Sequence, residues 1–264
     1  MNWLITGGCG FIGISLIARL LLDTDVKHNI RILDNLSTGT RDDLSSVAPF
    51  LEVENIDNLS ASLDGIELVV GDILDEDLAY KVTKNIDVIV HLAAQAGVRY
   101  SLENPRAYVD SNLVGTFNVM EAAKNLKVKH LLMASTSSVY GANEEMPFVE
   151  TEKTDTQLTL YAATKKANES MAHSYAYLWN LPTTMFRFFT VYGPWGRPDM
   201  AMFIFTKKIL ENKPIPVYNF GNMKRDFTFI DDIIAGTRSA IENNFQCEIF
   251  NLGNHKSENL MDMV

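Results

Sequence analysis

Short apolar runs alternate with longer amphipathic segments along most of the chain. The apolar runs predict buried strands over residues 2–6, 29–33, 66–70, 86–91, 130–135 and 184–189. The longer segments predict helices over residues 14–22, 105–127, 161–180 and about 200–212. This alternation predicts an α/β fold built on a doubly wound parallel sheet.

A glycine-rich loop follows the first predicted strand. It places glycines at Gly7, Gly10 and Gly13, where they permit a tight turn and a close approach of the backbone to a pyrophosphate. The N-terminus of the helix that follows offers unpaired N–H groups to the phosphates, and Phe11 and Ile12 are also expected to contact the cofactor. We therefore predict a Rossmann-type dinucleotide site, with an ordinary glycine turn as the alternative.

The second predicted strand ends in Asp34, 21 residues after Gly13. A carboxylate at this place accepts hydrogen bonds from the adenosine ribose and repels a 2′-phosphate, which favours NAD over NADP. Further cofactor contacts are expected where the strands and their loops end, at Asn35, Ser37, Gly39, Asp72, Ile73, Leu92, Ala93 and Ala94. Asp72 could equally be the N-cap of the next helix.

Tyr161 and Lys165 are four residues apart in a predicted helix and therefore share one face. A lysine ammonium beside a phenol favours the phenolate, which makes a base usable near neutral pH. The hydroxyl run from Ser135 to Ser138 follows an apolar strand, so its side chains are expected at the edge of the sheet where ligands bind. Tyr80 and Lys84 repeat the spacing, but we interpret that copy as a solvated helix face.

Composition excludes several classes of partner. The net charge of −10 and the pI near 5.0 argue against nucleic acid or an acidic membrane surface, and no apolar run is long enough to cross a bilayer. Cys9 and Cys247 lie far apart, so free thiols are expected, and the histidines form no metal-binding motif. We expect a cytoplasmic protein without a metal.

Two arginines are candidates for binding an anionic substrate. Arg197 lies in a Gly/Pro-rich loop over residues 190–199, and Arg225 precedes the run Asp226-Phe-Thr-Phe. The guanidinium fork of Arg225 could grip a diphosphate through charge-assisted hydrogen bonds. The alternative is a surface arginine paired with Asp226.

Together these motifs resemble the extended short-chain dehydrogenase/reductase family, which comprises the NAD-dependent nucleotide-sugar epimerases and dehydratases. The motifs that carry the resemblance are GGCGFIG, the strand-end Asp34, HLAA at 91–94, STSSVYG, YAATK and RDFTFIDD. The resemblance implies that Tyr161 is the catalytic base and that Lys165 holds the nicotinamide ribose and tunes Tyr161. It also implies that the hydroxyl of Thr136 relays or orients the sugar proton.

Within this family, AQAGVRYSLENP at 94–105 and RFFTVYGPWGRPDMA at 187–201 are most similar to the UDP-glucuronate 4-epimerases. Dehydratases of the family carry Asp-Glu where Ser137 and Ser138 stand here, and UDP-glucuronate decarboxylases carry Glu at position 138. The resemblance implies NAD-dependent 4-epimerisation of UDP-glucuronate. Residues expected to bind the substrate are Ser137, Ser138, Arg99, Thr190, Arg197, Val217, Tyr218 and Arg225.

We expect residues 1–182 to form the NAD-binding domain, with 184–192 and 230–252 returning to it. Residues 193–264 are expected to form a UDP-sugar lobe that is incomplete by comparison with the family. The helices over 105–127 and 161–180 would form a homodimer interface if the chain behaves as the family does. Three alternatives remain, namely an epimerase of another UDP-hexose or UDP-N-acetylhexosamine, a UDP-glucuronate decarboxylase, and a non-catalytic NAD-binding regulator.

Overall fold

The computed structural model describes residues 1–59, 63–243 and 245–264 and is built around one parallel sheet. The strands of this sheet are β1 (Asn2–Thr6), β2 (Asn29–Asp34), β3 (Leu51–Glu52), β4 (Ile66–Val70), β5 (Val88–His91), β6 (His130–Thr136), β7 (Thr183–Phe188) and β11 (Cys247–Leu252). Their spatial order is β11-β7-β6-β5-β1-β2-β4-β3, and each neighbouring pair runs parallel. The order reverses between β1 and β5, which confirms the doubly wound fold.

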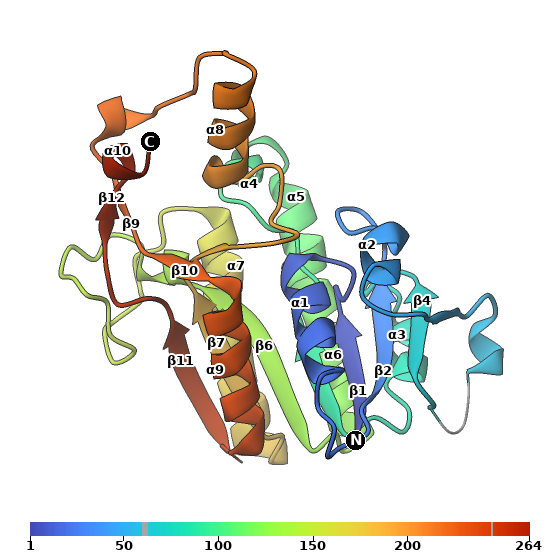
Figure 1. Cartoon of the computed structure of the whole chain (residues 1–264). Helices are drawn as coiled ribbons and strands as arrows, with labels where there is room; N and C mark the ends of the chain where they lie inside the picture. Colours follow the sequence, from blue (N-terminus) through green and yellow to red (C-terminus); the bar gives the residue numbers. More distant parts are fainter. Residues whose placement is uncertain (60–62, 244) are drawn as a thin grey trace.

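Helices cover both faces of the sheet. The α-helices are α1 (Phe11–Leu20), α2 (Arg41–Ser45), α3 (Glu76–Val82), α4 (Tyr100–Glu103), α5 (Pro105–Tyr108), α6 (Thr116–Asn125), α7 (Leu160–Trp179), α8 (Ala201–Leu210), α9 (Ile230–Glu242) and α10 (Leu260–Met263). The other helical turns are η1 (Ile56–Asn58), η2 (Val109–Gly115), η3 (Ser137–Tyr140) and η4 (Asn219–Gly221). Figure 1 shows α1 and α9 on one side of the sheet and α6 and α7 on the other.

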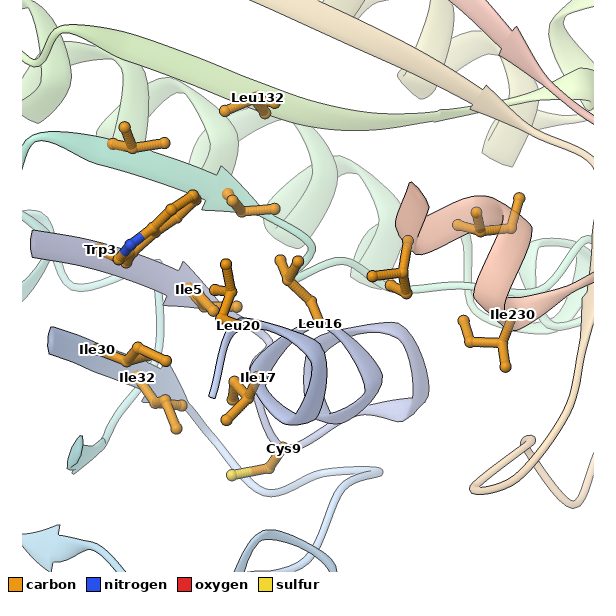
Figure 2. Close-up of a cluster of buried hydrophobic side chains, with 14 of the residues drawn as sticks. Trp3, Ile5, Cys9, Leu16, Ile17, Leu20, Ile30, Ile32, Leu132 and Ile230 are labelled. Carbon is orange, nitrogen blue, oxygen red and sulfur yellow. The ribbon is translucent and has the colours of Figure 1, made fainter. Parts of the chain in front are cut away.

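The strands are apolar on both sides because both faces are covered, which explains their near-continuous apolar sequence. Trp3 and Ile5 of β1 pack with α1 in one cluster, whereas Leu4 packs with α6 and α7 in the other. Figure 2 shows the first cluster, in which side chains of β1 and β2 lie beside α1, and Ile230 of α9 lies at the other side of the cluster. The two cores fix the sheet between its helices.

The last part of the chain divides between the sheet and a small lobe. Strand β11 and helix α9 join the sheet layers. In the lobe, β8 (Thr190–Tyr192) pairs with β10 (Phe227–Phe229), and β9 (Lys224–Arg225) pairs with β12 (Glu258–Asn259). Figure 1 shows β9, β12, α8 and α10 above the carboxyl ends of the sheet strands.

The predicted helix over 105–127 is helical without interruption from 105 to 125 but changes pitch in the middle. It consists of α5, the π-helical segment η2 and α6. Inside η2 the buried side chain of Asn112 accepts a hydrogen bond from the Gln95 N–H (2.8 Å) and donates to the Thr164 hydroxyl (3.1 Å). These bonds tie the helix to the loop after β5 and to α7, which gives a physical reason for the local change of pitch.

Two smaller expectations need correction. Helix α1 begins at Phe11 rather than at residue 14, because the chain becomes helical directly after Gly10. The N-cap of α3 is Asp75, whose carboxylate accepts a hydrogen bond from the Leu78 N–H, so the N-cap alternative for Asp72 is wrong.

Candidate active site

A cleft of about 1650 Å³ runs across the carboxyl ends of the strands, between the sheet and the lobe. It spans the point between β1 and β5 where the strand order reverses. Ligands of open α/β sheets bind at such a switch point. The cleft is therefore the candidate active site.

The glycine loop forms one end of the cleft. Gly7 has a φ of +70°, and a Cβ atom there would lie 2.7 Å from the Ala93 nitrogen. The first N–H groups of any α-helix have no intrahelical partner. In α1 the N-cap is Gly10, so no capping side chain accepts a hydrogen bond from them. A diphosphate fits this place, because the helix N-terminus favours negative charge and glycine leaves room for it.

Asp34 stands beside this loop at the end of β2. Its two carboxylate oxygens accept hydrogen bonds from the Cys9 N–H (2.9 Å) and the Leu36 N–H (2.8 Å), which fix the orientation of the group. Burial raises the pKa of Asp34, and these two hydrogen bonds oppose the rise. The remaining lone pairs of a carboxylate held in this way suit the two hydroxyls of an adenosine ribose.

The other predicted cofactor residues also lie along the cleft. Asn35 donates a hydrogen bond of 2.8 Å to Asp72 across the gap between β2 and β4. The residues expected at the cofactor that line the cleft are Gly7, Gly10, Phe11, Ile12, Gly13, Asp34, Asn35, Ser37, Gly39, Asp72, Ile73, Leu92, Ala93, Ala94, Tyr161 and Lys165. Their donors, glycine surfaces and carboxylate together fit NAD.

Tyr161 and Lys165 lie on the first turns of α7, which begins with the hydroxyl of Thr159 as its N-cap. Both side chains line the cleft, and so does Thr136 at the end of β6. The buried ammonium of Lys165 donates a hydrogen bond of 2.9 Å to the Ala134 carbonyl. The structure thus brings the three expected catalytic residues together.

The electrostatics of Tyr161 differ from the expectation. Burial raises the pKa of Tyr161, while a hydrogen bond with Thr136 and the charge of Arg197 lower it. Burial also disfavours the charged form of Lys165 and lowers its pKa to about 8. The pKa of Tyr161 lies above its ordinary value in the free protein, so the tuning of Tyr161 by Lys165 stays a prediction.

The hydroxyl run turns directly after β6 and stays in the cleft. The Thr136 side chain accepts a hydrogen bond from the Ser138 N–H (3.2 Å), which caps the turn η3. Ser137, Ser138, Thr190 and Arg197 line the same cleft as Tyr161. The four side chains combine hydroxyl donors with one guanidinium, a set that suits an anionic group on a sugar.

Three expected substrate residues lie away from the cleft wall. Arg99 is exposed, and its guanidinium stacks at 3.7 Å on the ring of Tyr218, so the two side chains bind each other. Val217 precedes Tyr218 and is likewise absent from the lining, so the binding roles of these three residues stay predictions. Arg225 does line the cleft and donates to the Lys224 carbonyl.

The alternative pairing of Arg225 with Asp226 is wrong in this structure. The carboxylate of Asp226 instead accepts hydrogen bonds from the Thr228 hydroxyl and the Asn254 N–H. The guanidinium of Arg225 is therefore available at the rim of the cleft.

Sequence reasoning missed a group of side chains that are linked to one another by hydrogen bonds next to the site: Glu169, Arg187, Tyr140 and Asn251. The one local signal was the position of Glu169, four residues after Lys165 on the same helix face. The others come from separate elements, so no spacing in the sequence indicates them.

The remaining candidates have structural explanations. His91 is buried, with the Thr6 hydroxyl at 2.7 Å from Nδ1 and the Thr116 hydroxyl at 2.9 Å from Nε2. Cys9 and Cys247 are free thiols. Within residues 1–59, 63–243 and 245–264, no three or more His, Cys, Asp or Glu side chains gather as a metal would require, and no helix there is long and apolar enough to span a bilayer.

Comparison with known proteins identifies the family of this chain. A family model described as "NAD dependent epimerase/dehydratase family" matches residues 3–253. A probable UDP-glucuronate 4-epimerase of Rhizobium meliloti (strain 1021) is 50% identical over 240 residues, covering 89% of this chain and 66% of the relative. The chain thus spans about two thirds of that relative's length.

Two solved structures have the same fold over nearly the whole chain. UDP-glucuronic acid 4-epimerase from Bacillus cereus, in complex with UDP-glucuronic acid and NAD, is 33% identical with a TM-score of 0.87, covering 100% of this chain and 81% of that one. UDP-N-acetylglucosamine 4-epimerase from Methanobrevibacter ruminantium M1 is 27% identical with a TM-score of 0.85, covering 99% and 79%. The chain belongs to the NAD-dependent epimerase/dehydratase family.

Proposed function

We propose that this chain catalyses the NAD-dependent 4-epimerisation of UDP-glucuronate to UDP-galacturonate. The observation that carries the proposal is that Ser137, Ser138, Thr190 and Arg197 line the same cleft as Tyr161. Positions 137 and 138 hold hydroxyls, which can donate to a sugar carboxylate without repelling it. The likeness to enzymes named for this reaction supports the same substrate.

In the proposed reaction, Tyr161 takes the proton from the 4-hydroxyl of the sugar. When NAD is bound, its oxidised nicotinamide accepts the hydride from C4 and later returns it. The hydroxyl of Thr136 orients the sugar oxygen and donates to the phenolate, which favours the base form. Tyr161 then gives its proton back to the 4-oxygen, so proton and hydride balance and no net oxidation occurs.

The 4-keto sugar must present its other face before the hydride returns. This requires firm binding of the nucleotide and looser binding of the sugar. We propose that residues 1–182, with 184–192 and 230–252, hold NAD, while 193–264 hold the UDP part through Arg225. The β-keto acid formed from glucuronate loses carbon dioxide readily, so donors that fix the carboxylate out of alignment with the carbonyl would protect it.

We also propose that the protein is a cytoplasmic homodimer. The large apolar side chains of Phe117 on α6 and Tyr177 on α7 are exposed, as expected for helices that meet a second copy. The free thiols Cys9 and Cys247 favour a reducing compartment. Size-exclusion chromatography with light scattering tests the dimer, and a monomer at micromolar concentration would contradict it.

A substrate panel tests the proposed reaction. The chain is incubated with NAD and, separately, UDP-glucuronate, UDP-glucose, UDP-N-acetylglucosamine and UDP-galacturonate, and the nucleotide sugars are separated by anion exchange. We expect UDP-galacturonate from UDP-glucuronate and the reverse conversion from the product. Release of carbon dioxide with a UDP-pentose would indicate a decarboxylase instead, and turnover of an uncharged sugar alone would reassign the substrate.

A further inference from the structure

Glu169 of α7 and Arg187 of β7 form a buried ion pair behind the catalytic residues. The guanidinium donates from Nε to Oε1 (2.9 Å) and from Nη2 to Oε2 (2.8 Å), and the side chains are 1% and 2% exposed. Burying such a pair costs desolvation, and apolar replacements of similar volume are often equally stable or more stable. Stability alone therefore does not explain a charged pair here.

The carboxylate of Glu169 joins the catalytic helix to the catalytic strand. Its Oε1 also accepts a hydrogen bond of 2.7 Å from the hydroxyl of Ser135, the residue before Thr136. Ser135 and Arg187 are register partners on β6 and β7, so Glu169 binds across both strands at once. Glu169 also follows Lys165 by one turn, which places the link directly beside the reacting groups.

Arg187 extends the same link to the hydroxyl turn. Its Nη1 donates to the Tyr140 phenol (3.0 Å), and its guanidinium lies 4.8 Å from the centre of that ring. Tyr140 is the last residue of η3, the turn that carries Ser137 and Ser138. The Tyr140 phenol in turn donates to Asn251 of β11 (2.7 Å). One ion pair thus contacts the helix, the strand and the turn from which the site is built.

We propose that Glu169 and Arg187 are positioning residues, which hold Thr136 on β6 at the correct distance from Tyr161 and Lys165 on α7. They act through Ser135 and Tyr140 and do not touch the sugar. The kinetic part of this inference rests on the proposed epimerase function. Because misplacing a reacting group by about 1 Å can cost about a hundredfold in rate, a loosened link should lower kcat.

The test replaces the whole pair, so that no charge is left buried alone. The double variant Glu169→Leu/Arg187→Met removes the link, and Glu67→Leu/Arg31→Met is the matched control. Arg31 and Glu67 are register partners on β2 and β4, 3.0 Å apart and 2% and 3% exposed, so they share the chemistry and the burial of the first pair. The control pair lacks the link to the hydroxyl turn, since Arg31 donates to the Val82 and Lys84 carbonyls. The first pair also includes the partly exposed Lys166, which lies 3.2 Å from Glu169.

Both double variants should fold, as shown by cooperative thermal unfolding. The Glu169/Arg187 variant should lose about tenfold or more in kcat with UDP-glucuronate while KM changes less than about threefold, and the control should keep its kcat. Equal kcat values in the two variants would overturn the proposal. If the first variant does not fold, Arg187→Lys, which keeps the charge but not the fork, should still lower kcat more than Arg31→Lys, and equal values would again overturn it.

A second readout needs no turnover. In NAD-saturated protein with ¹³C-labelled tyrosine, the titration of the Tyr161 ring is followed by NMR and assigned with Tyr161→Phe. Because the Thr136 hydroxyl stabilises the phenolate, loosening the link should move this titration to higher pH, and the control should leave it in place. An unmoved titration overturns the positioning role, whereas a moved titration in a protein that converts no UDP-glucuronate counts against the proposed function only.

Discussion

Arg197 binds Asp199 through two hydrogen bonds, from Nε to Oδ1 and from Nη2 to Oδ2, each 3.0 Å long. Both residues line the cleft. Within the described part of the chain, Nη1 of Arg197 has no hydrogen-bond partner. Because a guanidinium has five N–H donors in a fixed plane, Asp199 can orient it while a free edge remains for a ligand carboxylate.

We expect Arg197→Ala to weaken UDP-glucuronate binding far more than UDP binding. Loss of a charge-assisted hydrogen bond costs about 1.5–3 kcal/mol, which corresponds to about ten- to a hundredfold in Kd. Isothermal titration of both ligands measures the difference. Lys213→Ala, which removes an exposed ion pair with Glu211, is the control and should change neither affinity. Equal losses for the two ligands would mean that Arg197 supports the site generally and does not bind the sugar.

Tyr161→Phe should abolish turnover because it removes the only group we assign as base. A lost general base typically costs about 10²–10⁴ in rate. Binding of UDP, measured by titration, should remain close to that of the unmodified protein. Tyr80→Phe is the matched control, since Tyr80 also has a lysine four residues later and lies exposed on α3. A normal kcat in the Tyr161→Phe variant would refute the assignment.

His91 should make stability depend on pH. Burial lowers the pKa of His91 to about 3, against about 6.5 in an unfolded chain, so the unfolded state binds the proton more tightly. Stability from the neutral imidazole is therefore complete above about pH 6.5 and is lost as the pH falls toward 3. The full effect is on the order of a few kcal/mol in the free energy of unfolding.

Urea unfolding at pH 7.5 and pH 5 measures this effect. At pH 7.5, His91→Gln should have a lower free energy of unfolding than the unmodified protein. Between pH 7.5 and pH 5, its free energy of unfolding should fall by less. His173→Gln, at an exposed position of α7, serves as the control and should keep the full pH dependence. An unchanged dependence in His91→Gln would show that other groups cause it.

Gly7→Ala should weaken NAD binding and destabilise the fold. The new Cβ would meet the Ala93 backbone at 2.7 Å, and the positive φ adds strain on the order of 1–2 kcal/mol. Gly65→Ala is the control for strain alone, because Gly65 has a φ of +82° and no atom within 4 Å of the added Cβ. The difference in NAD affinity between the two variants measures how much the close contact between Gly7 and the Ala93 backbone matters for the cofactor site. Equal behaviour would show that Gly7 matters only for its conformation.

Local patterns predicted the sheet and the cofactor end of the cleft. The apolar runs matched β1, β2 and β4 within one residue, and the glycine loop and Asp34 reached one site because parallel strands end at the same edge. The Tyr161–Lys165 spacing was also informative, because helix geometry fixes which side chains share a face.

Long-range relationships could not be predicted in the same way. The Glu169–Arg187 pair depends on the register between β6 and β7 and on how α7 lies across them. The π-helical segment in the 105–127 helix depends on Asn112 finding partners in a loop and in another helix. The raised pKa of Tyr161 and the lowered pKa of Lys165 depend on burial, which no spacing in the sequence gives.

The most direct test of the central claim is a proton NMR time course of the purified chain with NAD and UDP-glucuronate, in which the couplings of sugar H4 are followed. The axial H4 of glucuronate has large couplings to its neighbours, and epimerisation makes H4 equatorial with small ones. We expect the small couplings to grow in while C5 keeps its single proton, as 4-epimerisation without loss of carbon dioxide requires. An unchanged spectrum, with NAD and UDP both shown to bind, would contradict it.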